Sequence, residues 1–171
     1  MVQIILAGVL MMLFLQTAEA DMNKNVGAKI KIYDVKSGAY QEVERIQRSE
    51  TEWKKTLSED QICIIRKKGT EAPFTGKYWN NKKQGIYQCA ACGTDLFGSD
   101  TKFESKTGWP SFFQPVAKEN VVLEEDKSLG MKRVEVLCAR CGAHLGHVFD
   151  DGPAPTHKRF CMNSAALKFS E

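Results

Sequence analysis

The chain has 171 residues, of which 43% are hydrophobic and 26% are charged, and its net charge is +3. These values are typical of a soluble globular protein. The lysines and arginines are interspersed with acidic residues, which argues against a nucleic-acid-binding surface.

Residues 1–20 predict a secretory signal peptide. No charge occurs in residues 2–15, and the segment ends Ala18-Glu19-Ala20, a pattern suited to signal-peptidase cleavage. An uncleaved membrane anchor is the alternative, but the apolar run is short for spanning a bilayer. Removing the segment, with its single charge on Glu19, raises the net charge from +3 to +4. We therefore expect a secreted protein or one of the secretory pathway, with a single domain after cleavage.

Residues 21–50 give weak signals, and we treat them as an N-terminal extension without an assigned function. Residues 29–33 alternate weakly between apolar and polar side chains, and Ser37-Gly38 is typical of a turn. The polar stretch 40–49 predicts a loop or a weak helix.

Residues 51–171 predict one domain that begins with a small helical layer. Ser49 precedes a first turn rich in acids, and Trp53 and Leu57 would share one helical face. Ser58, followed three residues later by glutamine, predicts a second helix start. The next residues place Cys63 among isoleucines, where packing is the favoured interpretation.

From residue 69 onward the pattern changes to short strands and turns. Apolar runs at 121–123 and 133–137 flank a polar, glycine-bearing loop, which predicts a hairpin. Residues 86–88 and 158–169 predict further strands. The fold class is therefore mainly β, with a small helical N-terminal layer.

Two C-x-x-C-G motifs predict a structural metal site. In each motif a tight turn lets two thiolates converge on one ion, and four soft ligands in a tetrahedron suit zinc. Two disulfides, redox dithiols or an iron site are the alternatives. The 45 residues between the motifs, 93–137, exceed the usual zinc-ribbon gap, so we expect an inserted subdomain. The predicted ligands are Cys89, Cys92, Cys138 and Cys141.

Cys161 belongs to neither motif, and two polar residues accompany it. In a strand, Arg159, Cys161 and Asn163 point to the same face, and a cation beside a thiol favours the nucleophilic thiolate. A buried core cysteine is the alternative. Taken singly, His144 and His147 are compatible with surface histidines, and Trp109 with a structural turn.

Five further segments occur before, between and after the two C-x-x-C-G motifs, which we call the two knuckles. They are Gly69-Thr70-Glu71-Ala72-Pro73-Phe74, Gly108-Trp109-Pro110-Ser111-Phe112, His144-Leu145-Gly146-His147-Val148-Phe149-Asp150, Asp151-Gly152-Pro153 and Arg159-Phe160-Cys161-Met162-Asn163-Ser164. Together they resemble the methionine sulfoxide reductase B family, from about residue 57 to residue 169. The resemblance implies two antiparallel sheets and a purely structural zinc. It also implies thiol-dependent reduction of the R epimer of methionine sulfoxide, free or in proteins.

The resemblance assigns roles to particular residues. Cys161 would attack the sulfoxide sulfur and become a sulfenic acid. His144, His147 and Asn163 would help to protonate the sulfoxide oxygen, directly or through water. By the same resemblance, Arg159 would keep the thiolate charged, and Trp109 would pack against the substrate methyl group.

The chain departs from the common family pattern in its second cysteine. Many members carry a resolving cysteine where Thr107 stands, whereas others carry one upstream, in the region of Cys63. We therefore expect a Cys63–Cys161 disulfide that thioredoxin or another dithiol reductant reduces, in a monomeric protein. Smaller departures are Phe160 in place of tyrosine and His157 where glycine is frequent.

A non-catalytic zinc-stapled β domain that binds a partner or small ligand is the competing class. Such a domain needs the two knuckles, but it does not need Cys161 together with its polar neighbours, the histidine pair and Trp109. Their joint occurrence favours the enzyme.

Overall fold

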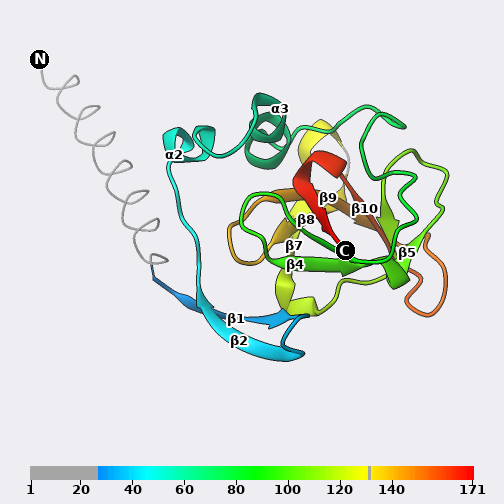
Figure 1. The fold of residues 1–171 in the computed structure, drawn as a ribbon. Helices are drawn as coiled ribbons and strands as arrows, with labels where there is room; N and C mark the ends of the chain where they lie inside the picture. Colours follow the sequence, from blue (N-terminus) through cyan, green and yellow to red (C-terminus); the bar gives the residue numbers. More distant parts are fainter. Residues whose placement is uncertain (1–26, 131) are drawn as a thin grey trace, which may run out of the picture.

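The computed structural model describes residues 27–130 and 132–171, which form three antiparallel sheets and a few short helices (Figure 1). The strands are β1 (Lys29–Asp34), β2 (Ala39–Glu44), β3 (Ile86–Cys89), β4 (Asp95–Gly98), β5 (Lys102–Phe103), β6 (Ser111–Phe112), β7 (Val121–Asp126), β8 (Arg133–Cys138), β9 (His144–Phe149), β10 (Arg159–Met162) and β11 (Leu167–Ser170). The helices and helical turns are α2 (Glu50–Lys54), α3 (Glu59–Gln61), η1 (Ile62–Arg66), η2 (Ser99–Thr101), η3 (Lys118–Asn120), η4 (Ser128–Gly130) and η5 (Ser164–Ala166).

Two sheets build the main domain, which confirms the predicted mainly β class. One sheet has six strands in the order β5-β6-β10-β9-β8-β7, and the other has three in the order β11-β3-β4. Aromatic rings fill the core: Phe97 stacks on Phe112 at 4.5 Å between centroids, and Tyr87 meets Phe112 edge to face at 5.0 Å. The predicted hairpin is also present, with Val122 opposite Leu137 in β7 and β8.

The C-terminal segment joins the two main sheets. Strand β10 lies inside the six-stranded sheet, and β11 pairs with β3 in the smaller one. The single turn η5 connects them, so the residues before this turn belong to the six-stranded sheet and those after it to the three-stranded sheet. The stretch 158–169, which predicted one or two final strands, therefore contributes to two strands with different partners.

The helical layer follows the predicted start signals. Ser49 forms a capping box with Glu52, and Ser58 forms one with Gln61. Trp53 and Leu57 are both buried, so they anchor this layer to the core. Figure 1 shows both helices on the same side of the sheets, and α3 contacts η1 and η5.

Cys63 does not pack with the isoleucines around it, so the packing interpretation was wrong. The helical turn η1 directs Ile62, Ile64 and Ile65 inward, and it leaves Cys63 exposed. A helical turn distributes adjacent side chains around its axis, so one of four consecutive apolar residues can face solvent. The apolar sequence alone suggested that all four residues, 62–65, are buried.

Residues 40–49 correct a second expectation, because Ala39–Glu44 form strand β2 rather than a loop or helix. This strand pairs with β1 in a two-stranded sheet, and Tyr33 meets Tyr40 edge to face at 5.3 Å. Nearly every residue of β2 is exposed, so the strand lacks the alternation that a half-buried strand shows.

The N-terminal hairpin is anchored to the main domain (Figure 1). The buried Asn120 side chain accepts a hydrogen bond from the Tyr33 N–H at 2.7 Å and donates to the carbonyls of Tyr33 and Asp95. Further along, the Ile46 N–H donates to the Arg140 carbonyl at 2.8 Å. The described part of the extension, from residue 27 onward, therefore packs on the domain although residues 21–50 carry no family motif.

The predicted signal peptide, residues 1–20, lies outside the described residues. Within the described ranges, no helix has the length and apolar character needed to cross a bilayer.

Candidate active site and metal centre

The four motif cysteines converge on one point between the two main sheets. Their Sγ atoms all lie within 4.8 Å of one another. The closest pairs are Cys92 with Cys138 at 3.5 Å and Cys89 with Cys141 at 3.7 Å, well beyond the S–S distance of a disulfide. The disulfide alternative therefore does not describe this arrangement, and the donor set suits a soft tetrahedral metal ion.

Matching turns present the four thiols. In the first knuckle the Gly93 N–H donates to the Cys89 carbonyl at 2.8 Å, and in the second the Gly142 N–H donates to the Cys138 carbonyl at 2.9 Å. Both glycines have positive φ, +76° and +64°, a conformation that is costly for residues with a Cβ. This requirement explains the glycine after each C-x-x-C pair.

Cys161 lies in the middle of the six-stranded sheet and is half-buried. Strand β10 places it opposite His147 in β9 and opposite Ser111 in β6. Its side chain borders a cavity of about 160 Å³. The other residues around this cavity are Thr70, Trp109, Arg133, Gly146, His147, Phe149 and Asn163.

Gly146 lets β9 pass close to the thiol-bearing strand. A Cβ at this position would lie 2.1 Å from the Cys161 carbonyl oxygen, so no larger residue fits without moving the backbone. The glycine within the His-Leu-Gly-His motif is therefore needed for packing at the site.

Burial raises the pKa of the Cys161 thiol above its ordinary value, and the Arg159 cation and hydrogen bonds from Thr107 and Ser111 oppose this effect only in part. The expected influence of Arg159 on the thiolate is present, but desolvation outweighs it. The Thr107 hydroxyl oxygen lies 4.0 Å from Cys161 Sγ. The free protein therefore carries mainly the thiol form near neutral pH.

Arg159 is held by an acid and an aromatic ring. Its Nε and Nη2 donate to the two carboxylate oxygens of Asp151, each at 2.9 Å, and its guanidinium lies 4.4 Å from the Phe149 ring centroid. These contacts fix the cation beside β10. Arg159 is not among the residues that border the cavity. Its charge therefore influences the Cys161 thiol from outside the cavity.

His147 faces the cavity, and a charged pair holds its ring. Its Nε2 lies 2.9 Å from Asp126 Oδ2, which also accepts a hydrogen bond from Arg133 Nη2 at 2.7 Å. Hydrogen bonds from Ser128, His147 and Arg133 hold the pKa of Asp126 well below its ordinary value. The acid therefore stays ionised and orients the imidazole.

His144 is buried behind His147, with 5.4 Å between the ring centroids. Its Nδ1 lies 2.7 Å from Glu135 Oε1, and Lys68 binds the other Glu135 oxygen at 2.7 Å. Burial lowers the pKa of His144, so the ring is neutral near pH 7. His144 does not border the Cys161 cavity and supports His147 from behind.

Asn163 and Trp109 meet on the segment around Glu71. Asn163 Oδ1 accepts a hydrogen bond from the Glu71 N–H at 3.2 Å, and its Nδ2 donates to the Leu145 carbonyl at 3.2 Å. Trp109 Nε1 donates to the Glu71 carbonyl at 3.0 Å. The Glu71 carboxylate in turn accepts the N–H groups of Ser164 and Ala165 at the start of η5.

Cys63 does not border the cavity of Cys161. It lines a separate cavity of about 710 Å³, and Thr70 borders both cavities. The structure therefore brings the two thiols into different cavities that share Thr70 as a lining residue.

Several residues around the site carried no predicted role. Asp126, Arg133 and Glu135 lie on β7 and β8, where the sequence showed only a hairpin, and Thr70 and Glu71 appeared only as motif letters. Glu135 lies directly opposite His147 in the pairing of β8 with β9. Once β8 and β9 are aligned as neighbours, this register indicates that Glu135 lies near the histidine pair. The fold and the site thus define a β domain with a half-buried thiol and a four-cysteine cluster that could hold a metal ion.

Comparisons with known proteins agree with this description. Residues 57–171 match the SelR domain family. Peptide methionine sulfoxide reductase MsrB of Methanosarcina barkeri is 58% identical over 124 residues, 72% of this chain and 87% of that protein. MsrB of Leptospira interrogans is 55% identical over 126 residues, 74% of this chain and 96% of that protein. The chloroplastic peptide methionine sulfoxide reductase B1 of Arabidopsis thaliana is 59% identical over 123 residues, 71% of this chain and 60% of that protein.

The chain therefore belongs to the methionine sulfoxide reductase B family and is an oxidoreductase of that family.

Proposed function

We propose that this chain reduces the R epimer of methionine sulfoxide, in proteins or free, to methionine, and that it thereby repairs oxidised proteins. The observation that carries this proposal is the Cys161 thiol, which shares one cavity with Trp109, His147 and Asn163 in a chain closely similar to named reductases. The indole offers an apolar surface for a methyl group, and the polar residues surround the place of a sulfoxide oxygen.

The first step forms a sulfenic acid. The Cys161 thiolate attacks the electrophilic sulfoxide sulfur and forms a Sγ–S bond, and the sulfoxide oxygen takes up one proton. The S–O bond to methionine and the new Sγ–S bond then break as the hydroxyl passes to Sγ, which leaves Cys161 as Cys–SOH and releases reduced methionine. Arg159 favours the thiolate that starts the reaction, since its cation offsets part of the burial penalty.

The polar residues of the site assist proton transfer. His147 uses Nε2 toward Asp126, so its Nδ1 remains for the substrate oxygen or for a water molecule. His144 supports the His147 ring, and the Asn163 amide fixes the cavity wall through Glu71 and Leu145. Thr107 offers a hydroxyl near the sulfur of Cys161.

The second step uses Cys63. Its thiolate attacks the Cys161 sulfenic acid, forms the Cys63–Cys161 disulfide and releases water, and thioredoxin or another dithiol then reduces the disulfide. The exposure of Cys63 supports access to such a reductant. Because Cys63 and Cys161 line different cavities, this step requires a change of conformation that brings the two sulfurs together.

The four-cysteine centre would hold one zinc ion through Cys89, Cys92, Cys138 and Cys141. With four thiolate ligands the ion has no open position, so it would stabilise the junction of the two sheets and take no part in the reaction. Cys138 ends a strand of the larger sheet and Cys89 ends a strand of the smaller one, which supports this role.

The purified chain with dithiothreitol tests the reaction on the separate R and S epimers of N-acetyl methionine sulfoxide. We expect reduction of the R epimer only, lost in Cys161→Ser and retained in the matched variant Cys63→Ser, because dithiothreitol replaces the resolving thiol. A folded, metal-loaded chain that reduces neither epimer would indicate the competing class, a non-catalytic β domain that binds a ligand.

Peptide mapping tests the resolving step. After one turnover without reductant, we expect a peptide that links Cys63 to Cys161, and a single cysteine sulfenic acid at residue 161 in Cys63→Ser. Recovery of unlinked Cys63 from the unaltered chain would show that this thiol does not resolve the intermediate.

We also propose that residues 1–20 direct the chain into the secretory pathway, on the apolar pattern and the small residues before Asp21. N-terminal sequencing of the protein from its natural source tests this, with Asp21 as the expected first residue. A mature protein that begins at Met1 would contradict cleavage.

A further inference from the structure

Apart from the cavity that Cys63 lines, a second cavity adjoins the one that contains Cys161, and Trp109 lines both this second cavity and the Cys161 cavity. The second cavity has a volume of about 240 Å³, and Phe74, Trp79 and Phe103 contribute to its walls. The cavity at Cys161 is small beside the roughly 300–1,000 Å³ of common ligand pockets, so it can hold one side chain. The residues that flank this side chain in a polypeptide must therefore lie over the adjoining surface.

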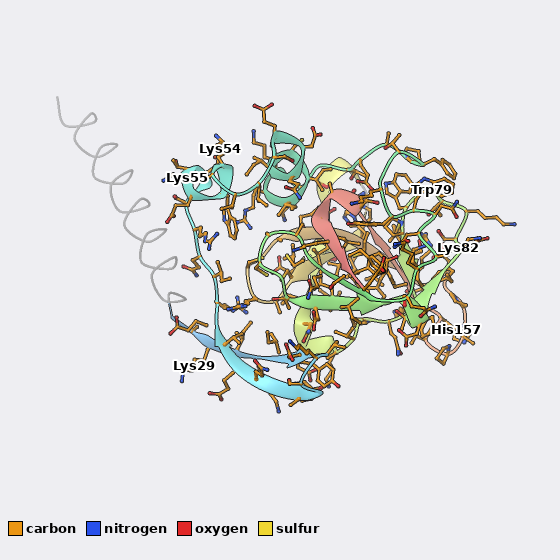
Figure 2. All side chains as sticks on the ribbon, viewed as in Figure 1. Lys29, Lys54, Lys55, Trp79, Lys82 and His157 are labelled. Carbon is orange, nitrogen blue, oxygen red and sulfur yellow. The ribbon has the colours of Figure 1, made fainter. Side chains whose placement is uncertain are left out.

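Two large aromatic side chains are exposed at the second cavity. Phe74 is 53% exposed and Trp79 is 39% exposed, and their rings meet edge to face with 5.3 Å between centroids. Figure 2 shows Trp79 at the surface near Lys82, on the side of the molecule opposite the hairpin that carries Lys29. Clustered exposed apolar surface beside a reaction site indicates a place where a partner binds.

The backbone fixes these rings relative to Trp109. Phe74 has a φ of +66°, a strained conformation for a bulky residue, and its N–H donates to the Gly108 carbonyl at 2.8 Å. On the other side of Trp109, the indole N–H donates to the Glu71 carbonyl at 3.0 Å. Such a conformation persists only where the surrounding structure holds it, as the hydrogen bond to Gly108 does here. The second cavity is therefore organised before a ligand arrives.

We propose that Phe74 and Trp79 form a subsite for an apolar side chain directly next to the oxidised methionine of a protein substrate. The inference rests on the proposed function and deepens it, because it makes an oxidised methionine in a hydrophobic sequence the preferred substrate. Glu104 and Lys106 border the subsite with opposite charges. We therefore expect no strong preference for a positively or a negatively charged substrate side chain.

Blocked pentapeptides test the subsite. The reference is Gly-Gly-Met-Gly-Gly with the R sulfoxide, and two further peptides carry leucine directly before or directly after the oxidised methionine. We expect kcat/KM for at least one leucine peptide to exceed that of the reference by about tenfold, the discrimination that an apolar pocket provides. N-acetyl methionine R-sulfoxide is measured in parallel to report the basic reaction.

Variants of the full chain locate the preference. We expect Trp79→Ala to reduce the ratio of kcat/KM for the leucine peptide to kcat/KM for the glycine reference below about twofold. Tyr40→Ala removes an equally exposed aromatic ring from the distant hairpin and should leave the ratio unchanged. Equal kcat/KM for all three peptides in the unaltered chain, with the N-acetyl compound still reduced, overturns the subsite alone. Absence of any R-sulfoxide reduction overturns the proposed function and the subsite together.

Discussion

At the scale of single residues, the burial of Cys161 affects the pKa of its thiol more than the neighbouring cation of Arg159 does. The extended pattern from Arg159 to Asn163 indicates a cation, a thiol and an amide on one face. The structure adds that burial dominates the pKa of the thiol and that Asp151 holds the Arg159 cation. The thiolate therefore depends on a charge that is already shared with an acid.

Replacing Arg159 by glutamine tests this balance. Because the pKa of Cys161 lies above its ordinary value of 9.0 and Arg159 lowers it, loss of the cation should raise the pKa further. Alkylation of Cys161 by iodoacetamide at pH 8, followed by mass spectrometry in a Cys63→Ser background, should slow about tenfold for a shift of one pKa unit. Arg45→Gln, on the exposed hairpin, should not change the rate, and an unchanged rate in Arg159→Gln would contradict the assignment.

A second residue-scale prediction concerns His157, which stands where glycine is frequent in the family. Its φ is +56°, a left-handed conformation that strains residues with a Cβ, and its side chain is exposed. His157→Gly should therefore raise the free energy of unfolding by about 0.5–1 kcal/mol, after the greater chain entropy of glycine is subtracted. Urea denaturation measures this, and His157→Ala, which keeps the Cβ, should give no gain.

At the scale of elements, a turn and a strand that lie far apart in sequence build the site together. Glu71 binds the start of η5 with its carboxylate, the Trp109 indole with its carbonyl and Asn163 with its N–H. The Gly-Thr-Glu segment thereby connects the Cys161 strand with the Gly-Trp-Pro turn. Its motif letters indicate family membership, but they do not indicate this connecting role.

Glu71→Gln should weaken that connection. The charged carboxylate accepts two backbone N–H groups, and the amide offers one oxygen and places N–H groups toward donors. We expect the free energy of unfolding to fall by about 1.5–3 kcal/mol, the range for a hydrogen bond to a charged group. Chemical denaturation compares it with Glu44→Gln, an exposed acid at the end of β2, which should change stability little. A loss no larger than that of the control would contradict the role.

At the scale of the whole molecule, the four-cysteine cluster lies where strands of the two main sheets end. Cys89 leads out of the three-stranded sheet and Cys138 out of the six-stranded sheet, and the N-terminal hairpin reaches the second knuckle through Ile46 and Arg140. With a metal bound, we expect the stability of the domain to depend on ligands contributed by both sheets.

Metal removal tests this dependence. Elemental analysis of the purified chain should give about one zinc per molecule, and a strong chelator should lower the Tm by at least about 10 °C, since structural zinc contributes much of the folding free energy in such sites. Cys92→Ser should reproduce the loss, whereas Cys63→Ser should retain both the metal and the Tm. An unchanged Tm after complete metal removal would contradict a structural role.

The sequence alone determined the mainly β class, the helix caps at Ser49 and Ser58, and the four-cysteine cluster. These features follow from local spacing and from residue chemistry, which depend little on distant contacts. Only the tertiary structure decided that Cys63 is exposed, that β2 is a strand and that Asp126, Glu135 and Glu71 support the site. These results depend on which segments pair across the sheets, and long-range pairing leaves no periodic trace in an exposed strand or in a single acidic residue.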